Sequence, residues 1–500
     1  GIVFLSQGKL LESKELFLKA IKLEPNELEG YFNLSSALIK LGDLEQAKKI
    51  MEKVIKIDPN LSLGYQNLGL ILNYMGDKKP SIEYFKRALQ KDSKSSFSKT
   101  ELIFILSELA LWDEFKEYSA YINNLGTDNE AINPFKLLHL EDNPENILKR
   151  SLNYYHSNFK RKTLDIKFIP KEKIHIGYFS TDFNDHPVMH LIAGVLEHHD
   201  KSSFNIFTYS LSNKKDSYTK RIQYSKCKFR DMSQLNDIEI IKQAREDELD
   251  IAIDLNGYTQ NSRMQIFANR VAPIQMNFLG CPMTTGSPEI DYLLADKTVI
   301  PEDDQSYYSE KIIYLPNCYM CFDRKRNISK VKFTRKECGL KEESFVLAAF
   351  HRIHKITPKE IQSWSRILHK IPNSVLWIGH TKGMAKENLL ECFLKNNINS
   401  NRVIFAKKVN TSEEHLSRHS CADLFLDTFN YNAQSTAMDS LWSGLPIVTK
   451  LGNCFKSRVC ASLLKTIGLK NLIGENIDEY ENIVIRLSNN RKELQAIKDH

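Results

Sequence analysis

Residues 175–187 have the sequence HIGYFSTDFNDHP, in which a short apolar run, His175–Phe179, is followed by a polar loop. Apolar runs of this length that alternate with helical stretches predict the strands of a parallel sheet covered by helices on both faces. In such sheets, ligands bind beside the carboxyl ends of the strands. The loop that follows this run is therefore the first place where we expect functional side chains.

The same pattern recurs along the rest of the chain in two series. The first series continues with Phe204–Tyr209, Ile251–Leu255, Gln275–Leu279, Tyr292–Ala295 and Lys311–Tyr314. The second series comprises Phe345–Phe350, Ser374–Ile378, Arg402–Ala406, Asp423–Leu426 and Pro446–Thr449. Two series of this kind predict two Rossmann-like α/β lobes, which we place at residues 173–322 and 340–500. No strand is followed by GxGxxG and no P-loop motif occurs, which argues against dinucleotide oxidoreductases and nucleoside triphosphatases.

The N-terminal part of the chain repeats every 34 residues. The positions in register are Gly8, Gly42 and Gly76, Tyr31 and Tyr65, and Pro25 and Pro59. A glycine that ends one helix and a proline that follows its partner are typical of the tetratricopeptide repeat. We assign residues 1–130 to an all-α repeat array and residues 131–172 to a helical linker. A fourth unit near Lys99 keeps Leu102 and Trp112 but lacks the glycine.

Repeat arrays of this type bind extended peptides on their concave face, so protein or peptide partners are expected. Asn33 and Asn67 lie one repeat apart on the first helix of their units. They are interpreted either as contacts to a peptide backbone or as solvated helix asparagines.

The composition limits the possible partners and the compartment. Of 500 residues, 69 are basic and 62 acidic, and the resulting net charge of +7 is scattered, which argues against a nucleic-acid partner. No apolar run reaches the ~18 residues that a membrane span needs, and no signal peptide pattern is found. Cys318 and Cys321 form a CxxC pair, but no second pair completes a metal site, so the nine cysteines favour a reducing, cytoplasmic location. The chain begins without Met inside a helical pattern, so we expect a piece of a longer protein.

Six long segments resemble the O-GlcNAc transferase family, in the same order as in that family. They are HIGYFSTDFNDHPVMHLIAG, DLNGYTQNSRMQIFANRVAPIQMNFLGCP, DYLLADKTVIPEDDQSYYSEKIIYLP, IPNSVLWIG, RVIFAKKVNTSEEHL and MDSLWSGLPIVTKLGNCFKSRVCASLL. Together with the repeats they cover nearly the whole chain. The resemblance implies a GT-B fold and the inverting transfer of N-acetylglucosamine from UDP-GlcNAc to serine or threonine hydroxyls of proteins.

The resemblance also implies a donor site in the second lobe. Lys355 and a helix that starts at Gln434, Ser435 and Thr436 would neutralise the leaving diphosphate, which suits a cation and free backbone N–H groups. Asp439 would accept hydrogen bonds from ribose hydroxyls, and His415 would stack on uracil. Solvated or purely structural roles for the lysine and the aspartate are the alternatives.

In the first lobe, the resemblance places His186 beside the sugar and the acceptor hydroxyl, with Asp254 and Thr259 lining the same pocket. Backbone groups of Leu279 and Gly280 would contact the nucleotide, because glycine permits a close approach. The residues expected to be catalytic are His186, Lys355 and Asp254. No cofactor and no metal are expected, since Lys355 and the helix start would replace a divalent ion.

Several positions depart from the family pattern around the donor. His354 replaces an aromatic hydroxyl, Ser412 stands where the family often has lysine, and Gln434 stands where animal members have histidine. Arg352 could supply the charge that is missing at Ser412. These departures leave the sugar open. The alternatives are a Spindly-type transfer of fucose from GDP-fucose, asparagine glucosylation, and an inactive scaffold.

Overall fold

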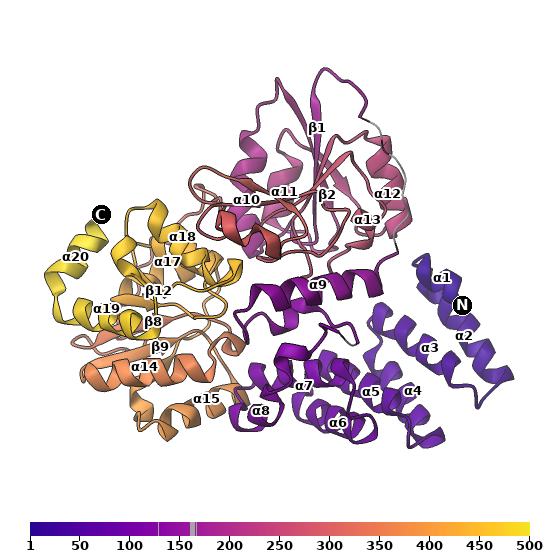
Figure 1. Cartoon of the computed structure of the whole chain (residues 1–500), viewed down its shortest axis with the longest axis horizontal. Helices are drawn as coiled ribbons and strands as arrows, with labels where there is room; N and C mark the ends of the chain where they lie inside the picture. Colours follow the sequence, from indigo (N-terminus) through magenta and orange to yellow (C-terminus); the bar gives the residue numbers. More distant parts are fainter. Residues whose placement is uncertain (129, 161–165, 167) are drawn as a thin grey trace.

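The computed structural model describes residues 1–128, 130–160, 166 and 168–500. A helical array leads through α9 (Pro144–Asn158) into an α/β lobe and then into a second α/β lobe, which ends the chain (Figure 1). This order confirms the predicted fold class. Positions 129, 161–165 and 167, which belong to the predicted array and linker, lie outside the described residues.

The repeat helices follow the 34-residue register. Their bounds are α1 Ile2–Ser6, α2 Leu10–Leu23, α3 Leu28–Leu41, α4 Leu44–Ile57, α5 Ser62–Met75, α6 Lys78–Lys91, α7 Ser96–Glu108 and α8 Trp112–Ser119. Gly42 and Gly76 end their helices in the left-handed conformation (φ +79° and +89°), which explains the glycine. The Tyr31 hydroxyl donates to the Pro25 carbonyl at 2.9 Å, and a tyrosine one repeat later makes the same bond.

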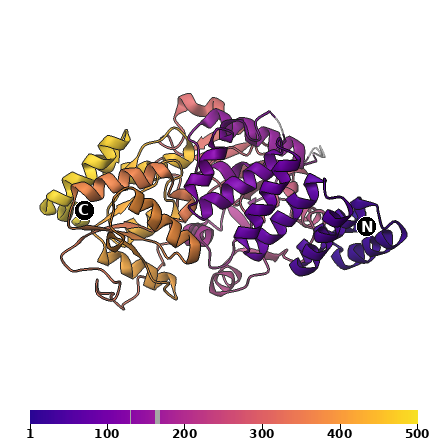
Figure 2. The same cartoon turned by 90° about the horizontal axis from the view of Figure 1, so that it is seen from below.

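The fourth unit keeps the backbone of the turn without its glycine. Ala110 lies 34 residues after Gly76 and has a φ of +53°. Its carbonyl accepts a hydrogen bond from Cys392 (3.9 Å), and the Leu109 carbonyl accepts one from Asn388 (2.8 Å), both in α15 (Gly383–Lys395). The last repeat unit therefore packs on the second lobe. In Figure 2 the array runs from this contact to the N-terminus at the far end of the molecule.

The first lobe contains a parallel sheet of strand order β3-β2-β1-β4-β5-β6-β7. The strands are β1 Ile174–Ser180, β2 Phe204–Ser210, β3 Lys228–Asp231, β4 Ile251–Asp254, β5 Ile274–Asn277, β6 Tyr292–Ala295 and β7 Lys311–Tyr314. The helices are α9 Pro144–Asn158, α10 Pro187–His198, α11 Ser217–Gln223, α12 Asp237–Glu246 and α13 Gln265–Ala268. The sequence did not predict β3, because this edge strand is polar and partly exposed and lacks an apolar run.

The second lobe contains a parallel sheet of order β10-β9-β8-β11-β12-β13. Its strands are β8 Phe345–Ala349, β9 Ser374–Ile378, β10 Val403–Phe405, β11 Leu424–Leu426, β12 Ile447–Lys450 and β13 Ile473–Gly474. Its helices are α14 Pro358–Lys370, α15 Gly383–Lys395, α16 Ser412–Ser417, α17 Ser435–Trp442, α18 Val459–Thr466, α19 Ile477–Asn489 and α20 Arg491–Asp499. Only the two-residue β13 escaped prediction. Within the described ranges, no helix is long and apolar enough to cross a membrane.

Each sheet reverses its strand order beside its first strand, at β1/β4 and at β8/β11. Ligand sites of open α/β sheets lie at such switch points, at the carboxyl ends of the strands. The loops after β1, β4 and β5 and after β8 and β11 are therefore the elements that position a site.

Candidate functional site

The loops at the two switch points face one another across the lobes. The helix α10, which starts after His186, contacts α17 of the second lobe. Burial lowers the pKa of His186 and Asp182 opposes this shift, while smaller contributions in the lowering direction come from His190, Lys214 and the exposed Arg352, which follows β8 in the other lobe. The structure thus brings the predicted residues of the first lobe next to the donor side of the second.

His186 caps α10 with its own ring. Its Nδ1 accepts a hydrogen bond from the backbone N–H of Val188 at 3.3 Å and lies 3.6 Å from Asp182 Oδ2. Because the lowered pKa favours the neutral imidazole, the single ring proton is then on Nε2. In this tautomer His186 offers its Nε2–H as a hydrogen-bond donor.

Asp254 lies beneath the loop that follows β4. Its carboxylate accepts hydrogen bonds from the backbone N–H groups of Asn256 and Gly257 (both 2.9 Å) and from Asn277 Nδ2 (3.0 Å). Burial raises its pKa to about 6. The carboxylate thus holds the loop, while the half-buried Thr259 donates to the Asn256 carbonyl at 3.0 Å.

Leu279 and Gly280 form a tight turn after β5. Leu279 adopts a left-handed backbone (φ +66°), which is unusual for a leucine and is found at functional sites. A Cβ at Gly280 would lie 2.0 Å from the Leu255 carbonyl oxygen. The backbone of the β4 loop therefore already requires glycine at this position, and the close approach of a nucleotide stays a prediction.

Lys355 extends from the loop after β8 toward the loop after β11. Its ammonium donates to the Asn432 carbonyl at 3.1 Å and lies 3.6 Å from the centroid of the Tyr431 ring. The side chain as a whole is half-buried, but these groups enclose its charged end. Burial lowers the pKa of Lys355 to about 7, against the opposing attraction of Asp427.

The helix start predicted at residues 434–436 is confirmed, because α17 begins at Ser435 with Gln434 as its N-cap. The Gln434 side chain makes no capping hydrogen bond, and no acidic residue lies in the first turn, which includes Thr436. Among the described residues, the buried Gln434 Nε2 has no partner. The positive end of this helix dipole is therefore open to an anion.

Asp439 lies one turn further along α17 and is buried. Its Oδ1 accepts a hydrogen bond from Arg326 Nη1, and burial raises its pKa. The second guanidinium nitrogen of Arg326 donates to Ser412 Oγ at 2.9 Å. The cation that contacts Ser412 is therefore Arg326, and the expectation that Arg352 supplies the missing charge stays a prediction.

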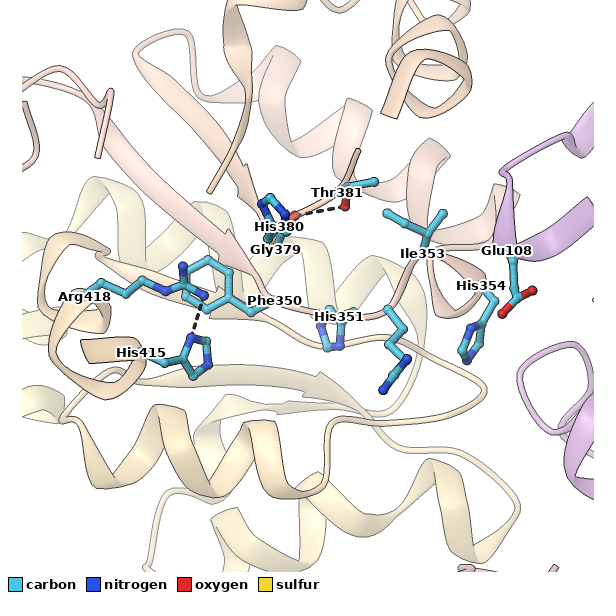
Figure 3. A pocket seen from close by; sticks show the side chains of 11 residues that line it. Glu108, Phe350, His351, Ile353, His354, Gly379, His380, Thr381, His415 and Arg418 are labelled. Carbon is cyan, nitrogen blue, oxygen red and sulfur yellow. Dashed lines mark hydrogen bonds between the residues drawn. The ribbon is translucent and has the colours of Figure 1, made fainter. Parts of the chain in front are cut away.

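His415 lies in a cavity of about 410 Å³ at the carboxyl ends of β8 and β9 (Figure 3). Arg418 Nη2 donates to His415 Nδ1 at 2.5 Å, and the His415 and Phe350 rings lie 5.6 Å apart. Burial lowers the pKa of His415 to about 2, which keeps the ring neutral. A neutral imidazole among aromatic side chains is suited to stacking on a planar base.

The repeat array contributes to this cavity. Its lining includes Glu108 of α7, together with His380 and Thr381 after β9 (Figure 3). Next to it, the His354 ring lies 5.5 Å from Phe104 of α7 and 5.0 Å from His139. Glu108 and Phe104 carried no signal in the sequence, because a contact between distant domains leaves no local pattern.

The predicted residues fall into two groups. The first group lies at the carboxyl ends of three adjacent strands of the first sheet and comprises His186, Asp254, Thr259, Leu279 and Gly280. The second group, which comprises Lys355, His415, Gln434, Ser435, Thr436 and Asp439, surrounds the switch point of the second sheet. In the part of the chain that the structure describes, no three His, Cys, Asp or Glu side chains gather to hold a metal ion.

Comparison with known proteins gives matches over the whole described fold. The model of glycosyl transferase family 41 matches residues 147–334 and 325–500, and a tetratricopeptide repeat model matches residues 28–61 and 64–94. A mutant O-GlcNAc transferase of Thermobaculum terrenum has a similar fold, with a TM-score of 0.71 over 99% of this chain and 90% of its own, at 22% identity.

Two plant proteins of Arabidopsis thaliana are similar in sequence. The probable UDP-N-acetylglucosamine–peptide N-acetylglucosaminyltransferase SEC is 35% identical over 65% of this chain, and the protein of the same description named SPINDLY is 32% identical over 66%. The chain spans 34% and 36% of the length of these relatives. On the extent of the family match, the chain belongs to glycosyl transferase family 41.

Proposed function

We propose that this chain is an inverting glycosyltransferase that moves N-acetylglucosamine from UDP-GlcNAc to serine or threonine hydroxyls of proteins, without a cofactor or a metal. The family membership supports a glycosyl transfer, and the names of the plant relatives support this donor and a peptide acceptor. The new bond forms between the acceptor oxygen and the anomeric carbon. The bond from that carbon to the diphosphate breaks with its electron pair, so UDP leaves as an anion, and the proton of the acceptor hydroxyl is released to solvent.

The observation that carries the proposal is the position of the Lys355 ammonium beside the segment that leads into α17. Lys355 donates to the Asn432 carbonyl, two residues before the N-cap Gln434, whose side chain makes no capping hydrogen bond. Negative charge on the diphosphate grows as the sugar bond breaks. Groups fixed in this position stabilise the transition state more than the ground state.

The remaining residues support roles on either side of the diphosphate. His415 in its aromatic cavity suits the uracil, and Asp439 suits a ribose hydroxyl. The Nε2–H of His186 suits a hydrogen bond to the sugar or to the acceptor. Asp254 acts through the loop after β4 that it holds, so we assign it a positioning role. Thr259, on the same loop, is then the residue that we place nearer to the sugar.

Protein acceptors would be bound by the repeat array, which extends away from the lobes (Figure 2). The Asn67 side chain donates to the Leu63 carbonyl of its own helix at 2.9 Å, so a peptide would have to compete for it. The cysteines are free thiols, which supports the cytoplasm as the compartment.

Transfer assays with a serine/threonine peptide test the proposal. UDP-GlcNAc is expected to add one N-acetylhexosamine to a hydroxyl side chain, as read by mass spectrometry with fragment analysis. Parallel reactions with GDP-fucose and with UDP-glucose on an asparagine peptide represent the other two enzymatic alternatives. If only the GDP-fucose reaction or only the UDP-glucose reaction modifies its peptide, that donor replaces UDP-GlcNAc in the proposal. If none of the three reactions modifies a peptide, the scaffold role remains.

A further inference from the structure

The segment that joins the two lobes is bonded to a helix of each. On the side of the first lobe, Asp323 pairs with Arg221 of α11 at 2.5 Å, and its backbone N–H donates to the His190 carbonyl of α10 at 3.1 Å. Three residues later, Arg326 reaches α17 of the second lobe. One short stretch therefore contacts both the helix that His186 caps and the helix that carries the donor site.

Arg326 is buried in the second lobe, with 3% of its side chain exposed. Its two terminal nitrogens donate to Asp439 Oδ1 and, at 2.9 Å, to Ser412 Oγ. Its carbonyl accepts from Trp442 Nε1 at 3.2 Å. The side chain and the backbone of one residue thus both hold α17, on the face that contains Asp439.

One of the two Asp439 carboxylate oxygens accepts a hydrogen bond from the described residues, and the other does not. Oδ1 is bonded to Arg326, while Oδ2 receives no hydrogen bond from any residue that the structure describes. Burial raises the pKa of Asp439, and the Arg326 charge opposes that rise. A buried carboxylate that keeps a free oxygen needs such a counter-charge to remain ionised.

We propose that Arg326 is a positioning residue of the donor site, which fixes the Asp439 carboxylate so that its free oxygen can accept a hydrogen bond from a hydroxyl of the nucleotide ribose. This inference rests on the proposed function, because it assumes a nucleotide beside α17. Arg326 acts through Asp439 and need not touch the donor itself.

A double-mutant cycle measures whether the two residues act as one unit. UDP binding is titrated calorimetrically with the full chain carrying Arg326→Met, Asp439→Asn or both. We expect each single change to weaken binding by roughly 10- to 100-fold, as for the loss of a hydrogen bond to a charged group. The double variant should bind no more weakly than Asp439→Asn. Losses that multiply would show independent roles and would overturn the inference.

The matched control is Arg324→Met, which removes an exposed arginine two residues earlier and should bind UDP like the wild type. Binding is also measured against pH. Without its counter-charge, Asp439 takes up a proton at higher pH, so the pH at which UDP affinity falls on acidification should rise in Arg326→Met. A weakening that is equal at every pH would indicate a merely structural residue and would contradict the proposal.

Arg326→Lys keeps the charge and provides the test if the methionine variant does not fold. It should show a smaller loss of affinity and a smaller upward shift of the same midpoint, and an unchanged midpoint with wild-type affinity would overturn the inference. A wild-type chain that binds neither UDP nor GDP would refute the proposed function instead. If the wild-type chain binds UDP and Arg326→Met binds UDP equally well, only the role of Arg326 is refuted.

Discussion

The ammonium of Lys355 lies 3.6 Å from the centroid of the Tyr431 ring. The two residues come from different loops, after β8 and after β11, and meet beside the start of α17. An aromatic ring replaces water on one side of a cation only. The other side of the ammonium of the half-buried lysine is therefore still able to bind an anion.

Replacing Lys355 by Met keeps the length of the side chain and removes the charge. We expect turnover to fall by roughly 10²–10³, or ~3–4 kcal/mol, by analogy with the loss of one oxyanion-hole donor. UDP affinity should fall less, because the charge on the diphosphate is greatest in the transition state. Steady-state kinetics and circular dichroism check this expectation. Near-wild-type turnover would assign the role to another cation, with Arg352 as the first candidate.

UDP binding is expected to weaken as the pH rises above 7. The pKa of Lys355 is about 7, so the free chain loses this charge above that pH, whereas a bound diphosphate favours the charged form. Binding then takes up a proton, and affinity falls by up to about tenfold per pH unit. Calorimetry in buffers of different ionisation enthalpy measures this uptake. It should vanish in Lys355→Met and begin at lower pH in Tyr431→Leu, and a persisting uptake in Lys355→Met would contradict the assignment.

Ala110→Gly tests the turn of the fourth repeat. A non-glycine residue in the left-handed conformation costs ~1–2 kcal/mol, which the substitution relieves, while the more flexible unfolded chain offsets ~0.4–1 kcal/mol. We expect the free energy of unfolding in urea to stay unchanged or to rise by up to about 1.5 kcal/mol. The control Ala88→Gly, in the buried interior of α6, should instead lose about 1 kcal/mol or more. Equal losses for the two variants would contradict this explanation of the turn.

Truncation separates the repeats that bind acceptors from the unit that supports the donor site. A chain that begins at Ser95 keeps α7, whose Phe104 packs on His354, and should retain UDP binding and transfer to short peptides while losing transfer to whole proteins. A chain that begins at Asn133 lacks this support and should lose UDP binding as well. Loss of short-peptide transfer in a folded chain from Ser95 would refute this division.

Local patterns predicted the strands and helix starts, because the apolar runs and the N-terminus of α17 are properties of neighbouring residues. Contacts between distant residues were not predictable from these patterns. Arg326 and Asp439 are 113 positions apart, and the packing of Gly280 on Leu255 joins two loops. The turn of the fourth repeat was predicted only in part, because Ala110 adopts a left-handed backbone conformation that residues with a side chain rarely adopt.

The most direct test of the central claim is a calorimetric titration of the full chain with UDP and, separately, with GDP, each with and without EDTA. The Lys355 ammonium and the open start of α17 are proposed to neutralise the diphosphate, and His415 to bind the uracil. The account predicts that UDP binds in preference to GDP and that EDTA leaves its affinity unchanged. Preferential binding of GDP, or UDP binding that disappears with EDTA, would contradict it.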